Sequence, residues 1–516
     1  MDNNGPSHAS TSTRGSEHTS GPLQLPHQKD LDSQLSPVEG LEPEAQAAVD
    51  SAVSAARAAF TAPVSLADRT ERLDRLEAMV RERADDFLEA LALDLGKHPT
   101  EGWTTELGTV LAEIGHLRKL LPEWLRPRKV PAAGSLAPSR SWVENQPLGT
   151  VLVIAPWNYP VQLVLSPLAG ALAAGNTAVV KPSEVTPHVA KVLVSALRDY
   201  LGDVVGVVTG GVPETTRVLQ HRFDHVFYTG NATVGRVVMR AAAQYLTPVT
   251  LELGGKSPVW IDDTVDLGTA ADRIAWAKFL NAGQTCVAPD YVMGPPEVLT
   301  RLEPLLVAAI RKLYGRNPAE SESYGRIVTE RHLSKLTDLL ADVAAEDVVT
   351  GGARELSQRY LAPTVIRSAV DGPFMRDEIF GPVLPLVPVE DHHAAVGTIN
   401  SGEKPLALYV FSEDDDVRTA FRGETSSGGL VLGAALVHLA HPQLPFGGVG
   451  ESGIGNYHGE YSLETFSHPR AVLDKPLAPD TLKVIYPPYG PLKSRLAKIA
   501  LGAPAPSTVV RKLLNR

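Results

Sequence analysis

Five short apolar runs alternate with helix-length segments between residues 151 and 253, and this alternation limits the fold more than any other feature of the chain. Apolar runs of this length suit strands that are buried on both faces of a sheet. Helix-length connections between such strands are βαβ crossovers, which make the strands parallel. The pattern therefore predicts an α/β fold with a parallel sheet covered by helices, its strands at residues 151–155, 177–180, 204–208, 225–228 and 249–253.

A second α/β series follows Ser257. It contains a helical pattern over residues 270–280 and apolar runs over residues 383–387 and 406–411 that we interpret as strands. No fixed-period repeat occurs along the chain, and 516 residues exceed what one ordinary core accommodates. Two α/β domains are therefore the predicted organisation.

The region ahead of the first sheet is predicted to be helical over residues 43–125. Leu73, Leu76 and Met79 recur there at helical spacing among Arg and Glu residues. Pro, Ser and Gly then interrupt short apolar pieces over residues 127–147, which predicts an exposed hairpin or connecting arm.

Composition excludes several classes of protein. A net charge of -11 makes nucleic acid a poor candidate partner, and one cysteine can form neither an internal disulfide nor a cysteine-rich zinc site, so no metal is expected. No apolar run approaches the roughly 20 residues of a membrane-spanning helix. Residues 1–40 are rich in Ser, Thr, Gly, His and Pro, which predicts a disordered leader rather than a secretion signal and a cytoplasmic protein.

The C-terminal segment is basic and has an apolar face formed by Leu492, Leu496 and Ile499. Two interpretations fit this pattern: a helix that lies on a membrane surface, or an ordinary C-terminal helix with a solvated face. The second is the commoner arrangement, and we expect it here.

Two glycine motifs are rejected as phosphate-binding sites. Residues 448–453 read G-x-G-x-x-G but lack the preceding strand and following helix that a dinucleotide fingerprint needs, so we expect a tightly turned loop. Residues 255–257 read Gly-Lys-Ser, but Thr250 stands where a P-loop has its first glycine.

A better cofactor candidate runs from Gly230 to Gly235. It follows a predicted strand and opens a predicted helix at residues 234–245, and the N-terminus of a helix favours phosphate. Strand–Gly–helix turns are common in α/β proteins, so the pattern alone does not establish a site.

Two polar side chains lie at predicted strand ends. Asn158, between Trp157 and Tyr159 in a turn flanked by prolines, is either a turn residue or an amide donor for a developing oxyanion. Glu252 ends an apolar strand, where burial would raise its pKa as a general base requires. The alternative for Glu252 is an exposed or salt-bridged carboxylate.

Cys286 is the only cysteine and follows a predicted helix within Asn-Ala-Gly-Gln-Thr-Cys. A lone cysteine is usually a small buried hydrophobe. Here glycine and small polar neighbours leave the sulfur approachable, which favours a reactive thiol.

Taken together, these segments resemble the aldehyde dehydrogenase superfamily, most closely its class-three branch of fatty and aromatic aldehyde oxidisers, with bacterial coniferyl-aldehyde-type members. The resemblance extends to residues 465–470 and 486–489 and rests on eight ordered motifs: PWNYP (156–160), AAGNTAVVKPSE (173–184), FYTG (227–230), LELGGKSP (251–258), NAGQTCVAPDY (281–291), RDEIFGPVLP (376–385), PLALYVFS (405–412) and LPFGGVGESGIGNYHG (444–459).

The resemblance implies two doubly wound α/β domains, a Rossmann-like cofactor domain and a catalytic domain, with a small β arm for oligomerisation. We expect the following division: a cofactor domain of residues 41–129 and 149–252, a catalytic domain of 253–430, an arm of 130–148 and 455–485, and a basic tail of 486–516. A homodimer bridged by the arm is also implied.

The resemblance further implies a mechanism. Cys286 as thiolate would attack the aldehyde, with the Asn158 side chain and the Cys286 backbone N–H holding the oxyanion. Hydride transfer would leave a thioester, and Glu252 would activate the hydrolytic water. The carboxylic acid is then released.

The remaining motif positions match cofactor contacts of the family. Lys181 and Glu184 correspond to positions around the adenine ribose, and Gly230 to the glycine beside the pyrophosphate. Glu378 corresponds to the carboxylate at the nicotinamide ribose. The other matched positions near the cofactor are Trp157, Asn231, Gly235 and Phe380.

Two departures from the family pattern affect specificity. Asn231-Ala232 replaces the usual Gly-Ser, and residues 431–435 read Val-Leu-Gly-Ala-Ala where class-three members tend to carry Asn-Asp. The expected cofactor is NAD, with NADP also accepted, because Glu184 repels a 2′-phosphate whereas Lys181 attracts it. The expected substrates are hydrophobic aldehydes; a dedicated semialdehyde or coniferyl-type aldehyde, or a non-catalytic binding role, are the alternatives.

Overall fold

The computed structural model describes residues 38–131 and 136–500. The predicted leader up to residue 37, residues 132–135 of the predicted arm and residues 501–516 of the predicted tail lie outside the described residues.

The described chain begins with the predicted helical region. Ser65 caps α3: its hydroxyl accepts from the Asp68 N–H, and the Asp68 carboxylate accepts from the Ser65 N–H, both at 3.1 Å. Between α5 and α6 five residues form a π-helix, η1. The elements are α2 (Pro43–Ala59), α3 (Leu66–Glu82), α4 (Ala84–Leu95), α5 (Pro99–Gly102), η1 (Trp103–Leu107) and α6 (Gly108–Trp124).

The first sheet contains all five strands predicted from the alternation, and they are parallel. Its spatial order is β17-β7-β6-β3-β4-β5, with β17 antiparallel to β7. The strands are β3 (Thr150–Ile154), β4 (Thr177–Lys181), β5 (Val205–Val207), β6 (His225–Thr229), β7 (Val249–Glu252) and β17 (Gly453–Ile454).

Alternate residues of these strands enter two different cores, as the period-two geometry of a strand requires. Val151 and Val153 pack into the core that includes the apolar residues of α3, α4, α6, α7 (Gln162–Ala173) and α8 (Pro187–Leu201). Leu152 and Ile154 pack into the core that includes α2, α9 (Val212–Leu219) and α10 (Ala232–Ala243). The sheet is therefore covered on both faces, which explains the continuous apolar runs.

The second sheet has seven strands in the order β10-β13-β14-β9-β8-β15-β16, all parallel except β10. The predicted strands at 383–387 and 406–411 and the helix at 270–280 all occur. The elements are β8 (Pro258–Ile261), β9 (Tyr291–Gly294), β10 (Val348–Thr350), β13 (Thr364–Arg367), β14 (Val383–Pro388), β15 (Ala407–Phe411), β16 (Gly429–Leu432), α11 (Leu267–Phe279), α12 (Pro296–Tyr314), α13 (Glu330–Ala341), α14 (His392–Ser401) and α15 (Asp415–Glu424).

Short elements connect the larger ones. A separate two-stranded ribbon is formed by β11 (Arg354–Glu355) and β12 (Tyr360–Leu361). The single-turn 3₁₀ helices are η3 (Leu280–Gly283), η4 (Pro318–Glu320), η5 (Ala345–Asp347), η6 (Pro373–Met375), η7 (Val437–Ala440) and η8 (Thr481–Ile485).

The arm is a three-stranded antiparallel sheet of β1 (Arg128–Val130), β2 (Arg140–Pro147) and β18 (Ser467–Asp474), and β1 begins two residues before the boundary predicted at residue 130. Helix α16 (Glu460–Thr465), just before β18, packs on α7 instead, where a Cβ at Gly170 would lie 2.8 Å from the Ser462 Cβ. The segment 455–485 therefore contributes to the first domain as well as to the arm.

The sequence also predicts a tightly turned loop at residues 448–453 and a helix near the C-terminus. The loop is a tight turn, as predicted: a Cβ at Gly448 would lie 2.0 Å from the Ser452 carbonyl oxygen. Helix α17 (Pro491–Ala500) forms, and its Leu492, Leu496 and Ile499 are 71%, 42% and 42% exposed. Within the described ranges, each helix is too short or too polar to cross a bilayer.

Candidate active site

The site begins at the carboxyl edge of the first sheet, where four parallel strands end close together. Strand β3 leads into the Asn158 turn, β4 ends on Lys181, β6 leads into Gly230 and β7 ends on Glu252. The strand order reverses between β3 and β6, since β4 and β5 lie on one side of β3 and β6 and β7 on the other. A reversal of this kind leaves a crevice at the carboxyl edge that suits a dinucleotide.

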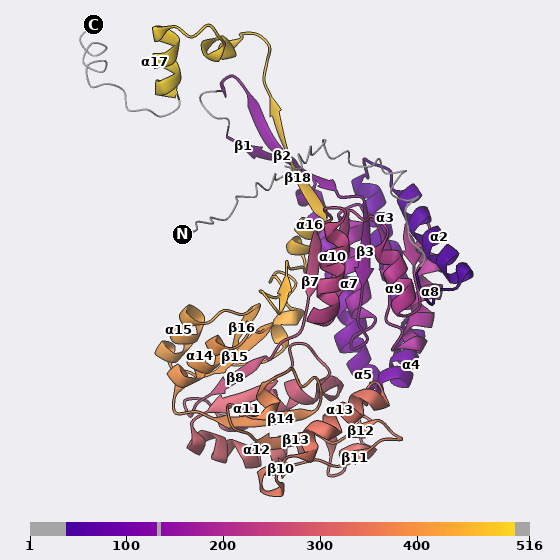
Figure 1. Cartoon of the computed structure of the whole chain (residues 1–516), viewed down its shortest axis with the longest axis vertical. Helices are drawn as coiled ribbons and strands as arrows, with labels where there is room; N and C mark the ends of the chain where they lie inside the picture. The colour runs from indigo at the N-terminus through magenta and orange to yellow at the C-terminus, as the bar shows by residue number, and fades with distance from the viewer. Residues whose placement is uncertain (1–37, 132–135, 501–516) are drawn as a thin grey trace, which may run out of the picture. The chain divides into compact units, whose positions relative to one another are not determined.

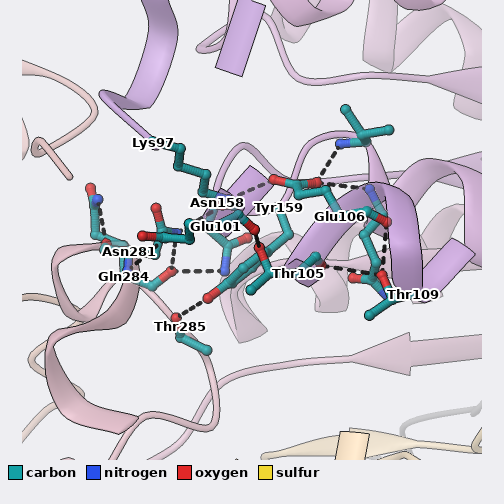
Figure 2. A network of polar contacts seen from close by, with 12 residues as sticks. Lys97, Glu101, Thr105, Glu106, Thr109, Asn158, Tyr159, Asn281, Gln284 and Thr285 are labelled. Carbon is teal, nitrogen blue, oxygen red and sulfur yellow. Dashed lines mark hydrogen bonds and ion pairs between the residues drawn. The ribbon is translucent and has the colours of Figure 1, made fainter. Parts of the chain in front are cut away.

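Asn158 joins this edge to the loop that carries Cys286. Its side chain is buried, and its amide nitrogen donates to the Gln284 carbonyl oxygen at 3.1 Å. Its backbone carbonyl oxygen accepts from Lys97 Nζ at 3.0 Å and from Asn281 Nδ2 at 2.8 Å (Figure 2). Asn158 is therefore held rigidly within hydrogen-bonding reach of the cysteine loop.

The cysteine loop has an unusual backbone. Asn281, Ala282 and Gly283 have φ angles of 52°, 51° and 73°, in the left-handed region. Gly283 is required, because a Cβ there would lie 2.3 Å from the Gly381 carbonyl oxygen. Gln284 fixes the turn: its amide donates to the Asn281 and Arg326 carbonyl oxygens, both at 3.0 Å. Such strain is maintained only by surrounding contacts and is commonly found at functional sites.

Cys286 is partly exposed at the end of this loop. Burial of the thiol, together with the nearby Glu378 and Glu252 carboxylates, raises the pKa of Cys286 to about 12. The residue is therefore a thiol at neutral pH in this state. The thiolate that the resemblance implied requires a change in its surroundings.

Glu252 is the last residue of β7, and its register partner is Gly453 of β17. The side chain is 2% exposed, and neither carboxylate oxygen has a hydrogen-bond partner among the residues that the structure describes. Burial alone raises the pKa of Glu252 well above its usual range. Of the two interpretations of Glu252, the exposed or salt-bridged carboxylate is wrong, and the desolvated carboxylate is confirmed.

Lys181 and Glu184 lie at the end of β4, two strands from Gly230. Lys181 Nζ donates to Glu184 Oε2 at 2.7 Å, with Lys181 buried and the Glu184 side chain half exposed. Partial burial raises the pKa of Glu184, but the hydrogen bond from Lys181, a backbone hydrogen bond and the Lys181 charge together outweigh it, and the pKa is lowered overall. This carboxylate is therefore charged at neutral pH.

Gly230 and Asn231 lie between β6 and α10, and Gly235 lies in the first turn of α10. The Gly230 N–H donates to the Glu252 carbonyl oxygen at 2.9 Å, so this glycine is next to the proposed base. Asn231 is the N-cap of α10, since its side-chain oxygen accepts from the Val234 N–H at 3.0 Å. The predicted helix start at residue 234 was wrong for this reason: the cap starts the helix at Ala232.

Glu378 lies near the cysteine, and Phe380, two residues further along the chain, contacts Trp157. Glu378 sits against the backbone of Gly254, where a Cβ would lie 2.1 Å from its Oε2. Burial first, and then the charge of Asp290, raises the pKa of Glu378 to about 8. Phe380 has a φ angle of 51°, and its ring packs edge-on against Trp157 with centroids 5.4 Å apart. These contacts bring Trp157 and Phe380 together from different sheets.

Sequence reasoning missed Lys97, Glu106 and Glu101. They belong to the polar network of Figure 2, which surrounds Asn158, Tyr159 and the cysteine loop. Lys97 and Glu106 lie in the N-terminal helical region, where a charged residue normally marks a solvated face. Nothing in that pattern distinguishes a buried ion pair, so only the packed structure reveals it.

Comparison with known proteins agrees with this geometry. The model of the aldehyde dehydrogenase family matches residues 36–472. The chain is 43% identical over 447 residues to the dimeric NADP-preferring aldehyde dehydrogenase of Canis lupus familiaris, covering 85% of this chain and 98% of that protein. It is 44% identical over 423 residues to the 4,4'-diaponeurosporen-aldehyde dehydrogenase of Staphylococcus aureus, covering 82% and 92%. A solved structure of the substrate-bound state of Staphylococcus aureus AldH is similar with a TM-score of 0.85 and 41% identity, covering 88% and 99%.

Proposed function

The chain belongs to the aldehyde dehydrogenase family. From this premise we propose that it oxidises hydrophobic aldehydes with NAD or NADP and that Cys286, Asn158 and Glu252 are its catalytic residues. The strongest support for the assignment comes from the Glu252 carboxylate. It is buried, has no hydrogen-bond partner among the described residues and lies close enough to Cys286 to help raise the pKa of the thiol. A carboxylate with no partner is available to take a proton.

In the proposed reaction the Cys286 sulfur bonds to the carbonyl carbon of the aldehyde. The thiol proton is released to solvent water, and the carbonyl oxygen accepts hydrogen bonds from the Asn158 amide and the Cys286 backbone N–H. When bound, the oxidised nicotinamide supplies a positive charge and accepts the hydride lost by the thiohemiacetal carbon. Glu252 then removes a proton from the water that attacks the resulting thioester, which releases the carboxylic acid and restores the thiol.

The residues present fit a dinucleotide. The strand-order reversal between β3 and β6, the start of α10 just after Gly230 and the Lys181–Glu184 pair lie along one sheet edge. We assign Lys181 and Glu184 to the adenine ribose and Gly230 to the pyrophosphate. Glu378 is assigned to the nicotinamide ribose.

The flanking positions have narrower proposed roles. Gly235 allows α10 to approach β7 closely, because a Cβ there would lie 3.1 Å from Leu253 Cδ2. Asn231 acts through the helix cap, and the Trp157–Phe380 contact forms one wall near the nicotinamide.

We propose a long or aromatic apolar substrate. The relative named for 4,4'-diaponeurosporen-aldehyde supports this choice, as do the small apolar residues that stand at 431–435 in place of an Asn-Asp pair. An apolar entrance discriminates in favour of apolar chains because it offers polar ones no compensating hydrogen bonds.

We also propose the domain division expected from the sequence, cofactor binding by 41–129 and 149–252 and catalysis by 253–430. The three-stranded arm sheet and the relative named as dimeric support a homodimer. The cytoplasm is the proposed location, in keeping with a single free cysteine.

One assay tests the proposed function. Formation of reduced cofactor is followed by its absorbance across short, long and aromatic aldehydes, with NAD and NADP each in turn. We expect kcat/KM to rise with apolar chain length and Cys286→Ala to be inactive while still binding cofactor. Appreciable turnover by Cys286→Ala would remove the nucleophile assignment, and a preference for short polar aldehydes would overturn the proposed substrate class.

A further inference from the structure

An ion pair is completely buried behind the proposed oxyanion site. Lys97 Nζ lies 2.5 Å from Glu106 Oε1, and both side chains are 0% exposed. Burying two charges is costly, and replacing such a pair with apolar side chains is often neutral or stabilising. Its position in the core therefore calls for an explanation other than stability.

The pair holds both ends of the turn that carries Asn158. Lys97 Nζ donates to the Asn158 carbonyl oxygen at 3.0 Å. Glu106 Oε2 accepts from the Val161 and Gln162 N–H groups at 3.0 and 2.9 Å. These two N–H groups lie at the start of α7, where no intrahelical partner is available. One ion pair thus holds both the backbone of Asn158 and the residues that lead from this short turn into α7.

The same cation reaches the cysteine loop through Tyr159. Lys97 Nζ lies 3.9 Å from the centroid of the Tyr159 ring, and the Tyr159 hydroxyl is 2.7 Å from Thr285 Oγ1. Thr285 directly precedes Cys286. Figure 2 shows Lys97 close to these groups, so the two sides of the oxyanion site are tied to one point.

Local backbone features place the two charges. Gly96 ends α4 with a φ angle of 65°, which turns the chain and directs Lys97 inward. Glu106 lies in the π-helix η1, a rare conformation that is frequently found at functional sites. Thr109 Oγ1, at the start of α6, donates to the Glu106 backbone carbonyl oxygen at 2.8 Å.

We propose that Lys97, held by Glu106, is a positioning residue that sets the orientation of the Asn158 amide toward the substrate oxygen. This inference rests on the proposed oxyanion role of Asn158. It predicts that Lys97 affects turnover chiefly through Asn158, with a smaller effect through the contact of Tyr159 with Thr285. A merely structural role predicts a loss of stability that is independent of Asn158.

The test is a double-mutant cycle on the full-length enzyme with its preferred aldehyde and cofactor. The variants are Lys97→Met, Asn158→Ala and the two combined. We expect Lys97→Met to lower kcat by about 10–10²-fold, since a small misplacement of a catalytic group costs that much. In the Asn158→Ala background the same change should cost less than about threefold, because coupled residues are not additive. The dissociation constant of the cofactor should stay unchanged.

Arg72→Met is the matched control, because Arg72 is a buried cation that donates to the Asn176 carbonyl oxygen at 3.1 Å in the same domain, outside the network. It should lower Tm and leave kcat unchanged. If Lys97→Met does not fold, the double variant Lys97→Met with Glu106→Gln takes its place. The amide oxygen of the substituted glutamine can still accept from the start of α7, and no lone charge remains buried.

The outcomes separate the inference from the proposed function. Equal losses in both backgrounds would overturn the positioning role, and so would failure of both Lys97 variants to fold, because the pair would then be needed for folding itself. Full turnover by Asn158→Ala would overturn the proposed function instead.

Discussion

The side-chain amide nitrogen of Asn158 donates to the backbone carbonyl oxygen of Gln284, two residues before Cys286, at 3.1 Å. A primary amide has two N–H donors, so this bond fixes the side chain and leaves one donor for the substrate. The donor is oriented before the aldehyde arrives. Electrostatic stabilisation by preoriented groups requires no reorganisation during the reaction, which makes it effective.

Asn158→Ala should lower kcat by ~10²–10³-fold, the usual loss when one oxyanion donor is removed. The aldehyde KM should change much less, because the donor acts mainly on the charge that develops during attack. Steady-state kinetics measure both constants. A kcat equal to that of the wild type would exclude Asn158 from the oxyanion site.

Alkylation of Cys286 by iodoacetamide should accelerate steadily from about pH 6 to about pH 9 in the free enzyme. Burial and the Glu378 and Glu252 carboxylates raise the pKa of Cys286 to about 12, so the thiolate fraction grows throughout this range. Mass spectrometry measures the alkylated fraction, and the label can be assigned to Cys286 because the chain has one cysteine. A plateau below about pH 8 would contradict the raised pKa, and Cys286→Ala provides the unlabelled control.

Glu252→Gln should give a burst of reduced cofactor followed by a stall, because the thioester forms but no base activates water. Burial raises the pKa of Glu252, so in the wild type the basic form is lost as the pH falls and hydrolysis should slow on the acidic side. Stopped-flow absorbance and mass detection of the acyl-enzyme measure both effects. Absence of the burst would place Glu252 in an earlier step.

Glu184→Gln should shift the cofactor preference toward NADP. The change removes a half-exposed negative charge and frees Lys181, which lies 2.7 Å from it, to meet a 2′-phosphate. The ratio of kcat/KM for NADP to that for NAD should rise about tenfold, as expected for about 1.4 kcal/mol of altered charge interaction. An unchanged ratio would show that the 2′-position lies away from this pair. Ser183→Ala, which leaves both charges in place, is the local control.

Glu113→Gln should reduce the loss of stability at alkaline pH. The Glu113 side chain is 3% exposed, and its Oε2 has no hydrogen-bond partner within the described part of the chain. Burial raises the pKa of Glu113 to about 7, so the folded state holds this proton more tightly than the unfolded state. Its contribution is complete below the unfolded pKa of about 4.3 and is lost as the pH rises through about 7.

Thermal unfolding measures this effect. The Tm of the wild type should fall more between about pH 5 and about pH 8 than that of Glu113→Gln, which keeps the acceptor for the Gly459 N–H but cannot ionise. Parallel Tm curves for the two proteins would show that Glu113 does not titrate in this range.

The sequence predicts the sheets well because burial on both faces leaves a continuous apolar signal at each strand. Val151 and Leu152 show why: they enter different cores, yet both must be apolar. Predicted boundaries differ from the structure where a side chain decides them, as at Asn231, whose cap starts α10 earlier than periodicity indicates. The desolvation of Glu252 was predictable from its place at an apolar strand end.

Other features depend on distant parts of the chain. Lys97 and Glu106 read as surface charges until the structure places them against Asn158 and the start of α7. The pKa of Cys286 depends on its burial and on Glu378, which lies in a loop far along the sequence. Such properties arise from packing between residues that are distant in the sequence, so local sequence patterns do not predict them.

The pairing of Gly453 with Glu252 has a consequence for the order in which the protein becomes active. Strand β7 gains its outer neighbour only from β17, and the Leu253 N–H donates to the Ser452 carbonyl oxygen at 3.1 Å. All three proposed catalytic residues leave the ribosome well before these partners do. In a nascent chain that already contains Cys286, the strand that carries Glu252 would therefore still lack its neighbour β17. Aldehyde oxidation would begin only once synthesis has passed the 448–453 turn.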